Sequence, residues 1–245
     1  MATVSATLEA QARRLRSIPL LEGLDDKELW NLAASLSWRE VRKGTTVLHK
    51  GTAGDHLLFL MKGSLQVLDI TESGQEIGLN LLRPGDHFGE LSVIDGGARS
   101  ASIVAMEHSE VALMPKAVAW NLFHHNPLVA QRILSSLAQK LRNASVYQTI
   151  LCLPNAAQRV YALLQRLARR APGNLVVIDH APKQRELAIL ANTSRETVSR
   201  TLTMLVEQGI VEKDNSRLIV RRPQELQRLA MFEAPDRPGS TGRGG

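Results

Sequence analysis

The sequence predicts an α+β protein in which an N-terminal antiparallel β-roll is followed by one long helix and a C-terminal winged helix-turn-helix. Three observations lead to this prediction. Short apolar runs bounded by glycines recur over residues 45–105, which is typical of an antiparallel barrel or sandwich. A helical repeat then extends from Pro127 to about Leu153. Beyond it, two short amphipathic segments joined by Asn-Thr have the spacing of a helix-turn-helix.

The composition is that of a globular protein long enough for two domains. The chain has 245 residues, of which 44% are hydrophobic, and its formal charge of +6 favours a polyanionic partner. The single cysteine, Cys152, excludes a disulfide framework, and its apolar neighbours predict a packed thiol. The sequence has no signal peptide and no apolar run of membrane-spanning length, so we expect a cytoplasmic protein without a membrane partner.

The N-terminal domain is expected to span residues 1–126. Apolar residues at helical spacing predict a helix over residues 5–17 and another over residues 24–36. Glycine-bounded apolar runs predict strands over residues 45–48, 57–61, 65–70, 77–82 and 102–105. Helical period returns at Ala117. A β-barrel of this kind without any binding site is the alternative interpretation.

The long helix is expected over residues 127–153. Its apolar positions step alternately by three and four residues, which sustains a heptad seam that needs a partner helix. The seam contains Leu134, Leu137, Leu141, Ala144, Gln148 and Leu151. Packing of this seam on its own barrel is the alternative, but basic residues on the outer faces favour a symmetric homodimer.

The C-terminal domain is expected over residues 154–233. Pro154 ends the long helix and Asn155 can cap the next one, predicted over residues 156–170. Residues 153–155 are therefore the expected domain boundary and hinge. Residues 234–245 are rich in Pro, Gly and Ser, and this composition predicts a disordered tail.

The helix-turn-helix prediction depends on which residues face inward. The first helix is predicted over residues 184–191, and Asn192 suits a turn position at positive φ. Ser194 can cap the second helix with its hydroxyl. The residues expected to be buried are Leu187, Ala188, Ala191, Val198, Leu202 and Leu205. Short strands on either side of residues 214–216 predict a β-hairpin wing.

The outer face of the second helix predicts contacts with double-stranded DNA. Arginine offers paired donors to guanine, and glutamate accepts from cytosine, when a helix enters the major groove. The residues expected to contact DNA are Arg185, Ser194, Arg195, Glu196, Ser199 and Arg200. An ordinary surface helix also carries charges, but the preceding helix, the turn and the wing together favour DNA binding.

A second site is predicted inside the β-roll. Residues 88–92, Phe-Gly-Glu-Leu-Ser, predict a tight entry into one helical turn whose free amides suit a phosphate. Arg99 can neutralise an anion, Glu90 can accept from a sugar hydroxyl, and Ser100 can donate to a phosphate oxygen. A structural ion pair between Glu90 and Arg99 is the alternative. No cluster with metal-ligand spacing and no nucleophile–base pair occurs, so neither a metal site nor an enzyme is expected.

In the order of these parts and in both motifs, the chain resembles the cyclic-AMP receptor (catabolite activator) and fumarate–nitrate regulator family of bacterial transcription factors. The resemblance covers nearly all of residues 20–225. It implies a homodimer that binds a palindromic operator, contacts RNA polymerase, and is controlled by a cyclic nucleotide in the β-roll. It places Glu90 on the ribose 2′-hydroxyl and Arg99 on the cyclic phosphate. The ligand-binding residues it implies are Gly89, Glu90, Leu91, Ser92, Arg99, Ser100, Ala144 and Ser145.

One departure from the family concerns the nucleotide base. Ala144 stands where the family's cyclic-AMP responders place a threonine, while Ser145 matches. Loss of that hydroxyl is expected to weaken discrimination between bases. The expected effector is therefore cyclic AMP or cyclic GMP, with cyclic diguanylate as an alternative. The expected mechanism is coupling, in which the ligand fixes the angle across Pro154 and hence the spacing of two recognition helices. A constitutive regulator with a purely structural β-roll is the rival interpretation.

Overall fold

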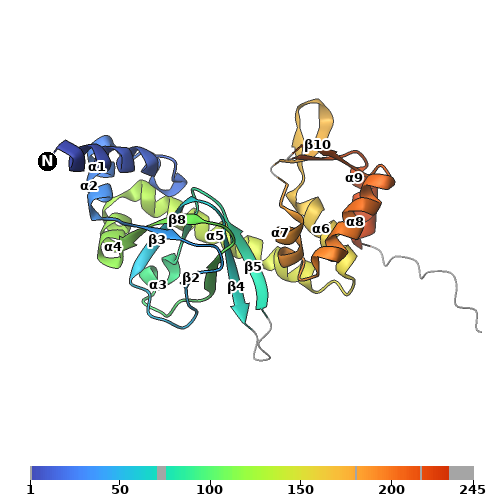
Figure 1. Cartoon of the computed structure of the whole chain (residues 1–245), viewed down its shortest axis with the longest axis horizontal. Helices are drawn as coiled ribbons and strands as arrows, with labels where there is room; N and C mark the ends of the chain where they lie inside the picture. The colour runs from blue at the N-terminus through green and yellow to red at the C-terminus, as the bar shows by residue number, and fades with distance from the viewer. Residues whose placement is uncertain (1, 71–75, 180, 216, 232–245) are drawn as a thin grey trace, which may run out of the picture. The chain divides into compact units, whose positions relative to one another are not determined.

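The computed structural model describes residues 2–70, 76–179, 181–215 and 217–231. The chain forms two compact units, Met1–Asn143 and Ala144–Gly245 (Figure 1). The expected α+β fold is confirmed, because antiparallel sheets, one long helix and a helix-turn-helix follow one another in the predicted order. The tail predicted over residues 234–245 lies outside the described residues.

Two helices open the N-terminal unit, α1 (Ala2–Leu15) and α2 (Asp26–Ser35), with the short 3-10 helix η1 (Pro19–Leu21) between them. The start of α2 is set by a capping box. The side chain of Asp25 accepts from the amide of Glu28, and the Glu28 side chain accepts from the amide of Asp25, both at 2.8 Å.

The described part of this unit contains two antiparallel four-stranded sheets, ordered β1-β8-β3-β6 and β2-β7-β4-β5. The strands are β1 (Ser37–Val41), β2 (Thr46–Leu48), β3 (His56–Lys62), β4 (Leu65–Ile70), β5 (Glu76–Leu82), β6 (His87–Phe88), β7 (Ser102–Ala105) and β8 (Ser109–Pro115). Side chains alternate between the two faces of strand β3, and both faces are buried because each packs against a different core. Leu58 and Leu60 enter a core shared by both sheets, whereas Leu57 and Phe59 pack with the helices.

All five predicted strands are present, but β1, β6 and β8 were not predicted. Strand β1 is mostly polar and exposed, so it lacks an apolar run. Strand β6 has only two residues. Strand β8 continues into α4 (Lys116–His125) without an intervening glycine, so no turn marks its end.

Helix α5 (Pro127–Leu151) ends two residues before the predicted position. Its first turns are anchored in the N-terminal unit by Val129 and Ile133, which are 0% and 4% exposed. By contrast, the seam residues Leu134 and Leu141 are 66% and 70% exposed. Within the described residues, no helix has both the length and the apolar character needed to span a membrane.

The C-terminal unit is built around one apolar core. After α5 its elements are α6 (Ala156–Leu167), β9 (Arg169–Ala171), η2 (Pro172–Asn174), β10 (Leu175–Ile178), α7 (Gln184–Leu190), α8 (Arg195–Glu207), β11 (Val211–Asp214), β12 (Arg217–Val220) and α9 (Pro223–Met231). The expected hairpin wing is present as β11 and β12, and β10 and β9 extend it to a four-stranded sheet.

Two predictions about this unit were wrong. Helix α6 ends at Leu167, not at Arg170, because Arg169 and Arg170 pair with Val177 and Val176 in β9. Charged residues tolerate both an exposed helix end and an edge strand, so the sequence did not distinguish these states. Cys152 is exposed and not packed, because it follows the last turn of α5.

Candidate functional site

The phosphate-binding motif begins at Gly89, the N-cap of helix α3 (Glu90–Ile94). Gly89 has a φ of 77°, a conformation that strongly favours glycine. A Cβ atom at this position would lie 2.4 Å from Nη1 of Arg99, which is closer than nonbonded atoms can approach. The glycine therefore serves both the backbone turn and the close approach of the arginine.

Arg99 is a buried cation, only 4% exposed. Its Nη1 donates to the carbonyl of Gly89 and its Nη2 to the carbonyl of His56, both at 2.8 Å. Burial lowers the pKa of its guanidinium, while Asp55 and Glu90 act in the opposite direction. Arginine has five N–H donors, so this geometry leaves donors for an anion.

The loop that precedes β3 packs closely against Arg99. The Arg99 amide donates to the carbonyl of Thr52 at 2.8 Å, and the Gly51 amide donates to the carbonyl of Arg99 at 2.9 Å. A Cβ atom on Gly54 would lie 2.2 Å from Cβ of Ser92 and 3.0 Å from Cζ of Arg99. Arg99 is thus held by backbone atoms on several sides, which fixes the position of its charge.

Glu90 is 5% exposed and pairs with Lys140, which was not among the predicted site residues. Its Oε1 atom lies 3.0 Å from Nζ of Lys140 on α5, and the same ammonium group donates to the carbonyl of His87 at 3.2 Å. Within the described residues, Glu90 and Arg99 form no ion pair with each other. The alternative of a structural Glu90–Arg99 pair is therefore wrong.

His87 lies next to the Glu90–Lys140 pair, and its imidazole is kept neutral. Burial and the nearby charge of Lys140 lower its pKa to about 4. Its Nε2 atom lies 3.2 Å from Oγ of Ser136 on α5. Lys140 and Ser136 thus both contact this part of the β-roll from α5, and their four-residue separation places them on one helix face.

The remaining predicted ligand residues differ in exposure. Ser92 is 1% exposed on α3, whereas Leu91 is 42% exposed. Ser100 is exposed directly after Arg99, and Ala144 and Ser145 are exposed on α5 in the C-terminal unit. Contacts of Ala144 and Ser145 with a nucleotide base stay a prediction.

The predicted helix-turn-helix is present as α7 and α8. Asn192 has a φ of 44°, as expected for the turn. Ser194 caps α8, and its Oγ atom accepts from the amide of Thr197 at 3.1 Å. Val198, Leu202 and Leu205 are 0%, 5% and 0% exposed and form the buried face of α8.

The residues expected to contact DNA are largely on the outside of this motif. Arg185, Ser194, Arg195, Glu196 and Arg200 are exposed, and Ser199 is half-buried. Backbone and Ser194 hydrogen bonds, together with Arg195 and Arg200, lower the pKa of Glu196. The carboxylate is therefore ionised at neutral pH and can act only as an acceptor, as contact with cytosine N4 requires.

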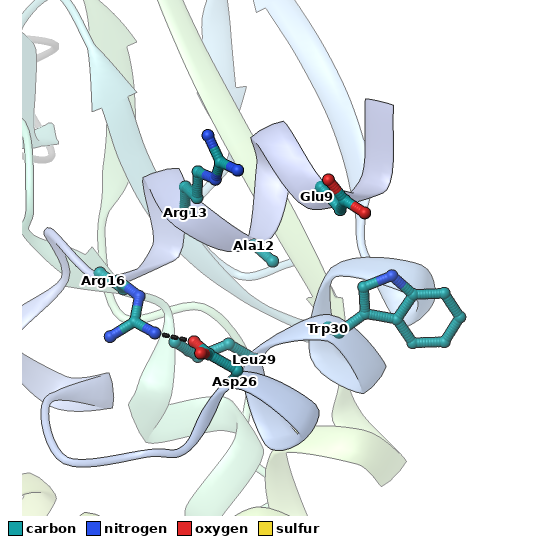
Figure 2. Close-up of a pocket in the computed structure, with 7 residues that line it drawn as sticks. All are labelled: Glu9, Ala12, Arg13, Arg16, Asp26, Leu29 and Trp30. Carbon is teal, nitrogen blue, oxygen red and sulfur yellow. Dashed lines mark ion pairs between the residues drawn. The ribbon is translucent and has the colours of Figure 1, made fainter. Parts of the chain in front are cut away.

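A separate cleft of about 470 Å³ lies beside α1 and α2 (Figure 2). Its lining includes two arginines and two carboxylates, and Arg16 pairs with Asp26. Trp30 borders the cleft and is 41% exposed. None of the predicted ligand or DNA residues lines this cleft.

Comparison with known families gives two matches that coincide with the two motifs. Residues 38–126 match the cyclic nucleotide-binding domain, and residues 158–229 match the Crp-like helix-turn-helix domain. The first match contains Gly89, Glu90 and Arg99, and the second contains α7 and α8.

The similarity to two relatives extends over almost their whole length. The chain is 36% identical over 217 residues to the cyclic AMP receptor protein of Thermus thermophilus, covering 88% of this chain and 98% of the relative. It is 26% identical over 214 residues to the CRP-like cAMP-activated global transcriptional regulator of Mycobacterium tuberculosis, covering 86% and 96%.

The structure of FixK2 from Bradyrhizobium japonicum has a similar fold, with a TM-score of 0.64 at 22% identity over 81% of this chain and 99% of that chain. Because one relative is more than 30% identical over almost its whole length, the matches establish more than a shared fold. The chain belongs to the cyclic-AMP receptor family of transcription regulators, which are DNA-binding proteins and not enzymes.

Proposed function

We propose that this protein is a homodimeric transcription regulator whose affinity for a palindromic operator is controlled by a cyclic nucleotide bound in the β-roll. The single observation that carries this proposal is the buried guanidinium of Arg99, oriented by the carbonyls of Gly89 and His56. A buried charge needs compensation, and a cyclic phosphate supplies it together with hydrogen-bond acceptors.

Phosphate recognition uses Arg99 and the first turn of α3. The amides of that turn have no partners within the helix and attract an anion. Gly89 permits the close approach of Arg99 to this turn. Ser100 and Ser92 supply hydroxyl groups from the adjoining loop and from α3, and Leu91 supplies an apolar contact.

Ribose recognition uses Glu90, which already has a cationic neighbour. The carboxylate can accept from a ribose hydroxyl while it remains paired with Lys140, because each carboxylate has two oxygens and several lone pairs. The ligand then shares the Glu90 charge with Lys140. Ligand binding is thereby sensed by α5, on which Lys140 lies.

The effector we favour is cyclic AMP. The relatives from Thermus and Mycobacterium are named for cyclic AMP, and the pocket motif is the same type of site. Ala144 supplies no hydroxyl to distinguish adenine from guanine, so cyclic GMP is the first competitor to test. Cyclic diguanylate is the second competitor. Its two phosphates would require a cation in addition to Arg99, and the ammonium group of Lys140, beside Glu90, could supply it.

Dimerisation is assigned to α5. Leu134 and Leu141 are one heptad apart and more than half exposed, although they are apolar. A second α5 covering both leucines would form a coiled-coil seam. A dimer also places two copies of α8 one helical turn apart on DNA, which matches a palindromic operator.

DNA contact is assigned to α8 together with Arg185 of α7. Arg195, Glu196 and Arg200 read base edges, and Ser194, Ser199 and Arg185 contact phosphates. Regulation through RNA polymerase and a cytoplasmic location complete the proposal.

A constitutive regulator with a structural β-roll is the second candidate. It is favoured by one observation, that Glu90 and Arg99 both have hydrogen-bond partners within the protein. Calorimetry of the purified chain with cyclic AMP, cyclic GMP and cyclic diguanylate separates the candidates. Heat release with at least one nucleotide, together with tighter binding to a DNA duplex enriched from a random library, is expected. Absence of heat with all three nucleotides would favour the second candidate.

A further inference from the structure

Arg159 on α6 contacts four backbone carbonyls from two different places in the C-terminal unit. Its Nη1 donates to the carbonyl of Leu153 at 2.9 Å and, more weakly, to that of Pro154 at 3.4 Å. Its Nε donates to the carbonyl of Ala191 at 2.8 Å and its Nη2 to that of Asn192 at 3.0 Å. One planar guanidinium thus joins the segment after α5 to the turn between α7 and α8.

These carbonyls follow the ends of two helices. Helix α5 ends at Leu151 and α7 ends at Leu190, so the carbonyls that Arg159 contacts lie one to three residues beyond the helix ends. The C-terminal ends of helices also carry partial negative charge, which a cation stabilises. The position of Arg159 between both ends therefore has a clear energetic reason.

Tyr147 makes a second connection, between the last turns of α5 and the end of α7. Its hydroxyl, on α5, donates to the carbonyl of Leu190, the last residue of α7. Burial raises the pKa of Tyr147 to about 12, so the hydroxyl keeps its proton at every physiological pH. The last turns of α5 are thus attached to α7 directly, and not only through the chain at Pro154.

We propose that Arg159 and Tyr147 are positioning residues for DNA recognition, which hold the turn at residues 191–193 against the end of α5 and so set the orientation of α8. This inference rests on the proposed function, because it assigns how the long helix and the reading helix move together. Together these two side chains form a clamp on the turn.

The clamp contacts the chain just before the start of α8, so a change there can reorient this helix. Ser194, the cap of α8, is only two residues beyond Asn192. The turn itself is closed by short-range bonds from the amides of Asn192 to Ile189 and of Thr193 to Ala188, at 3.1 and 2.9 Å. A rigid turn passes a displacement at Asn192 directly to the first turn of α8, where Arg195 and Glu196 lie.

The test replaces Arg159 by a residue of similar length without donors. Arg159→Met is compared with Arg166→Met, a matched control that removes an exposed arginine from the same helix. Each full-length variant is titrated against a duplex enriched by the wild-type chain and against a random duplex of equal length. Loss of the three shorter charge-assisted bonds, to Leu153, Ala191 and Asn192, predicts at least about tenfold weaker binding to the enriched duplex. Binding to the random duplex is expected to change less than about twofold, because phosphate contacts are untouched.

Equal losses on both duplexes, or no loss on either, would overturn the positioning role. A double-mutant cycle with Tyr147→Phe adds a second criterion, because the two side chains act on one turn. The combined variant is expected to lose less affinity than the two single losses predict, and strictly additive losses would show that no clamp exists. Tyr147→Phe also keeps the test informative if Arg159→Met does not fold, since a loss confined to the enriched duplex is again required.

Hydrogen exchange separates failure of the clamp from failure of the proposed function. In the free protein, Arg159→Met should speed exchange at the amides of Asn192 and Thr193 by about tenfold or more, while that of Leu60 in β3 stays unchanged. Unchanged exchange at the turn would overturn the clamp even if no DNA sequence is preferred. A wild-type chain without sequence preference would instead overturn the proposed function.

Discussion

Arg99 provides the sharpest test of the nucleotide pocket. Replacing it by alanine removes the only buried guanidinium that the described β-roll residues offer to a phosphate. It also leaves the carbonyls of Gly89 and His56 without their donor. The substitution therefore has two separable effects, one on ligand affinity and one on the stability of the empty domain.

Both effects can be estimated from the geometry. Two charge-assisted hydrogen bonds to a phosphate contribute about 3–6 kcal/mol, which corresponds to roughly 10²- to 10⁴-fold in the dissociation constant. Each of the two carbonyls loses one donor, which destabilises the fold by about 1–3 kcal/mol per carbonyl if no water replaces that donor. Arg99→Lys keeps the charge but cannot reproduce the planar fork, so it is expected to have intermediate affinity.

Calorimetry with cyclic AMP and thermal unfolding without ligand are measured on Arg99→Ala, Arg99→Lys and Arg39→Ala. Arg39 is an exposed arginine on β1 and serves as the matched control for loss of one positive charge. The expected order of affinity is Arg39→Ala equal to wild type, then Arg99→Lys, then Arg99→Ala. A folded Arg99→Ala variant that still binds cyclic AMP within about threefold of wild type would refute this reasoning.

Three further predictions concern the seam, the buried histidine and the cap. Leu134→Glu with Leu141→Glu should convert the proposed dimer to monomer in analytical ultracentrifugation, because each leucine buried in the seam would contribute about 1.5–3 kcal/mol. Gln131→Glu is the control, and a dimer that persists in the double variant would contradict the seam. The pKa of His87 is about 4, below its ordinary 6.5. As the pH falls from 6.5 to 4 the unfolded chain binds the proton first, so the free energy of unfolding should fall by at most about 3 kcal/mol. His87→Gln should flatten this dependence in urea titrations, and an unchanged slope would exclude His87 as its source. Ser194→Ala should reduce stability by about 0.5–2 kcal/mol in the same titrations, and unaltered stability would mean that the cap contributes nothing.

Local pattern was enough to predict the parts that depend on nearby residues. The cap at Ser194, the positive φ of Asn192 and the stripe of Val198, Leu202 and Leu205 all follow from interactions within a few residues. The turn at Gly89 before α3 is predictable for the same reason. Strands without an apolar run, such as β1, were missed because their pairing partner lies far along the chain.

Lys140 shows why the site itself could be only partly predicted. The motif predicted Gly89, Glu90 and Arg99 as site residues, but its spacing contains no information about which cation pairs with Glu90. Lys140 is 50 residues away from Glu90 in sequence. On α5 it reads as one of several solvent-facing basic residues, and only packing of that helix on the β-roll brings its ammonium group to the carboxylate.

The sequence by itself determined the order of the main parts, the turn at Asn192, the cap at Ser194, and the two motifs that define the family. Hydrogen bonding and side-chain period act over a few residues, so the residues themselves carry that information. Only the tertiary structure decided that Glu90 pairs with Lys140 and that Arg159 reaches Ala191, 32 residues away. Such contacts arise when separate elements pack, and the packing is set by the whole core and not by any segment's own pattern.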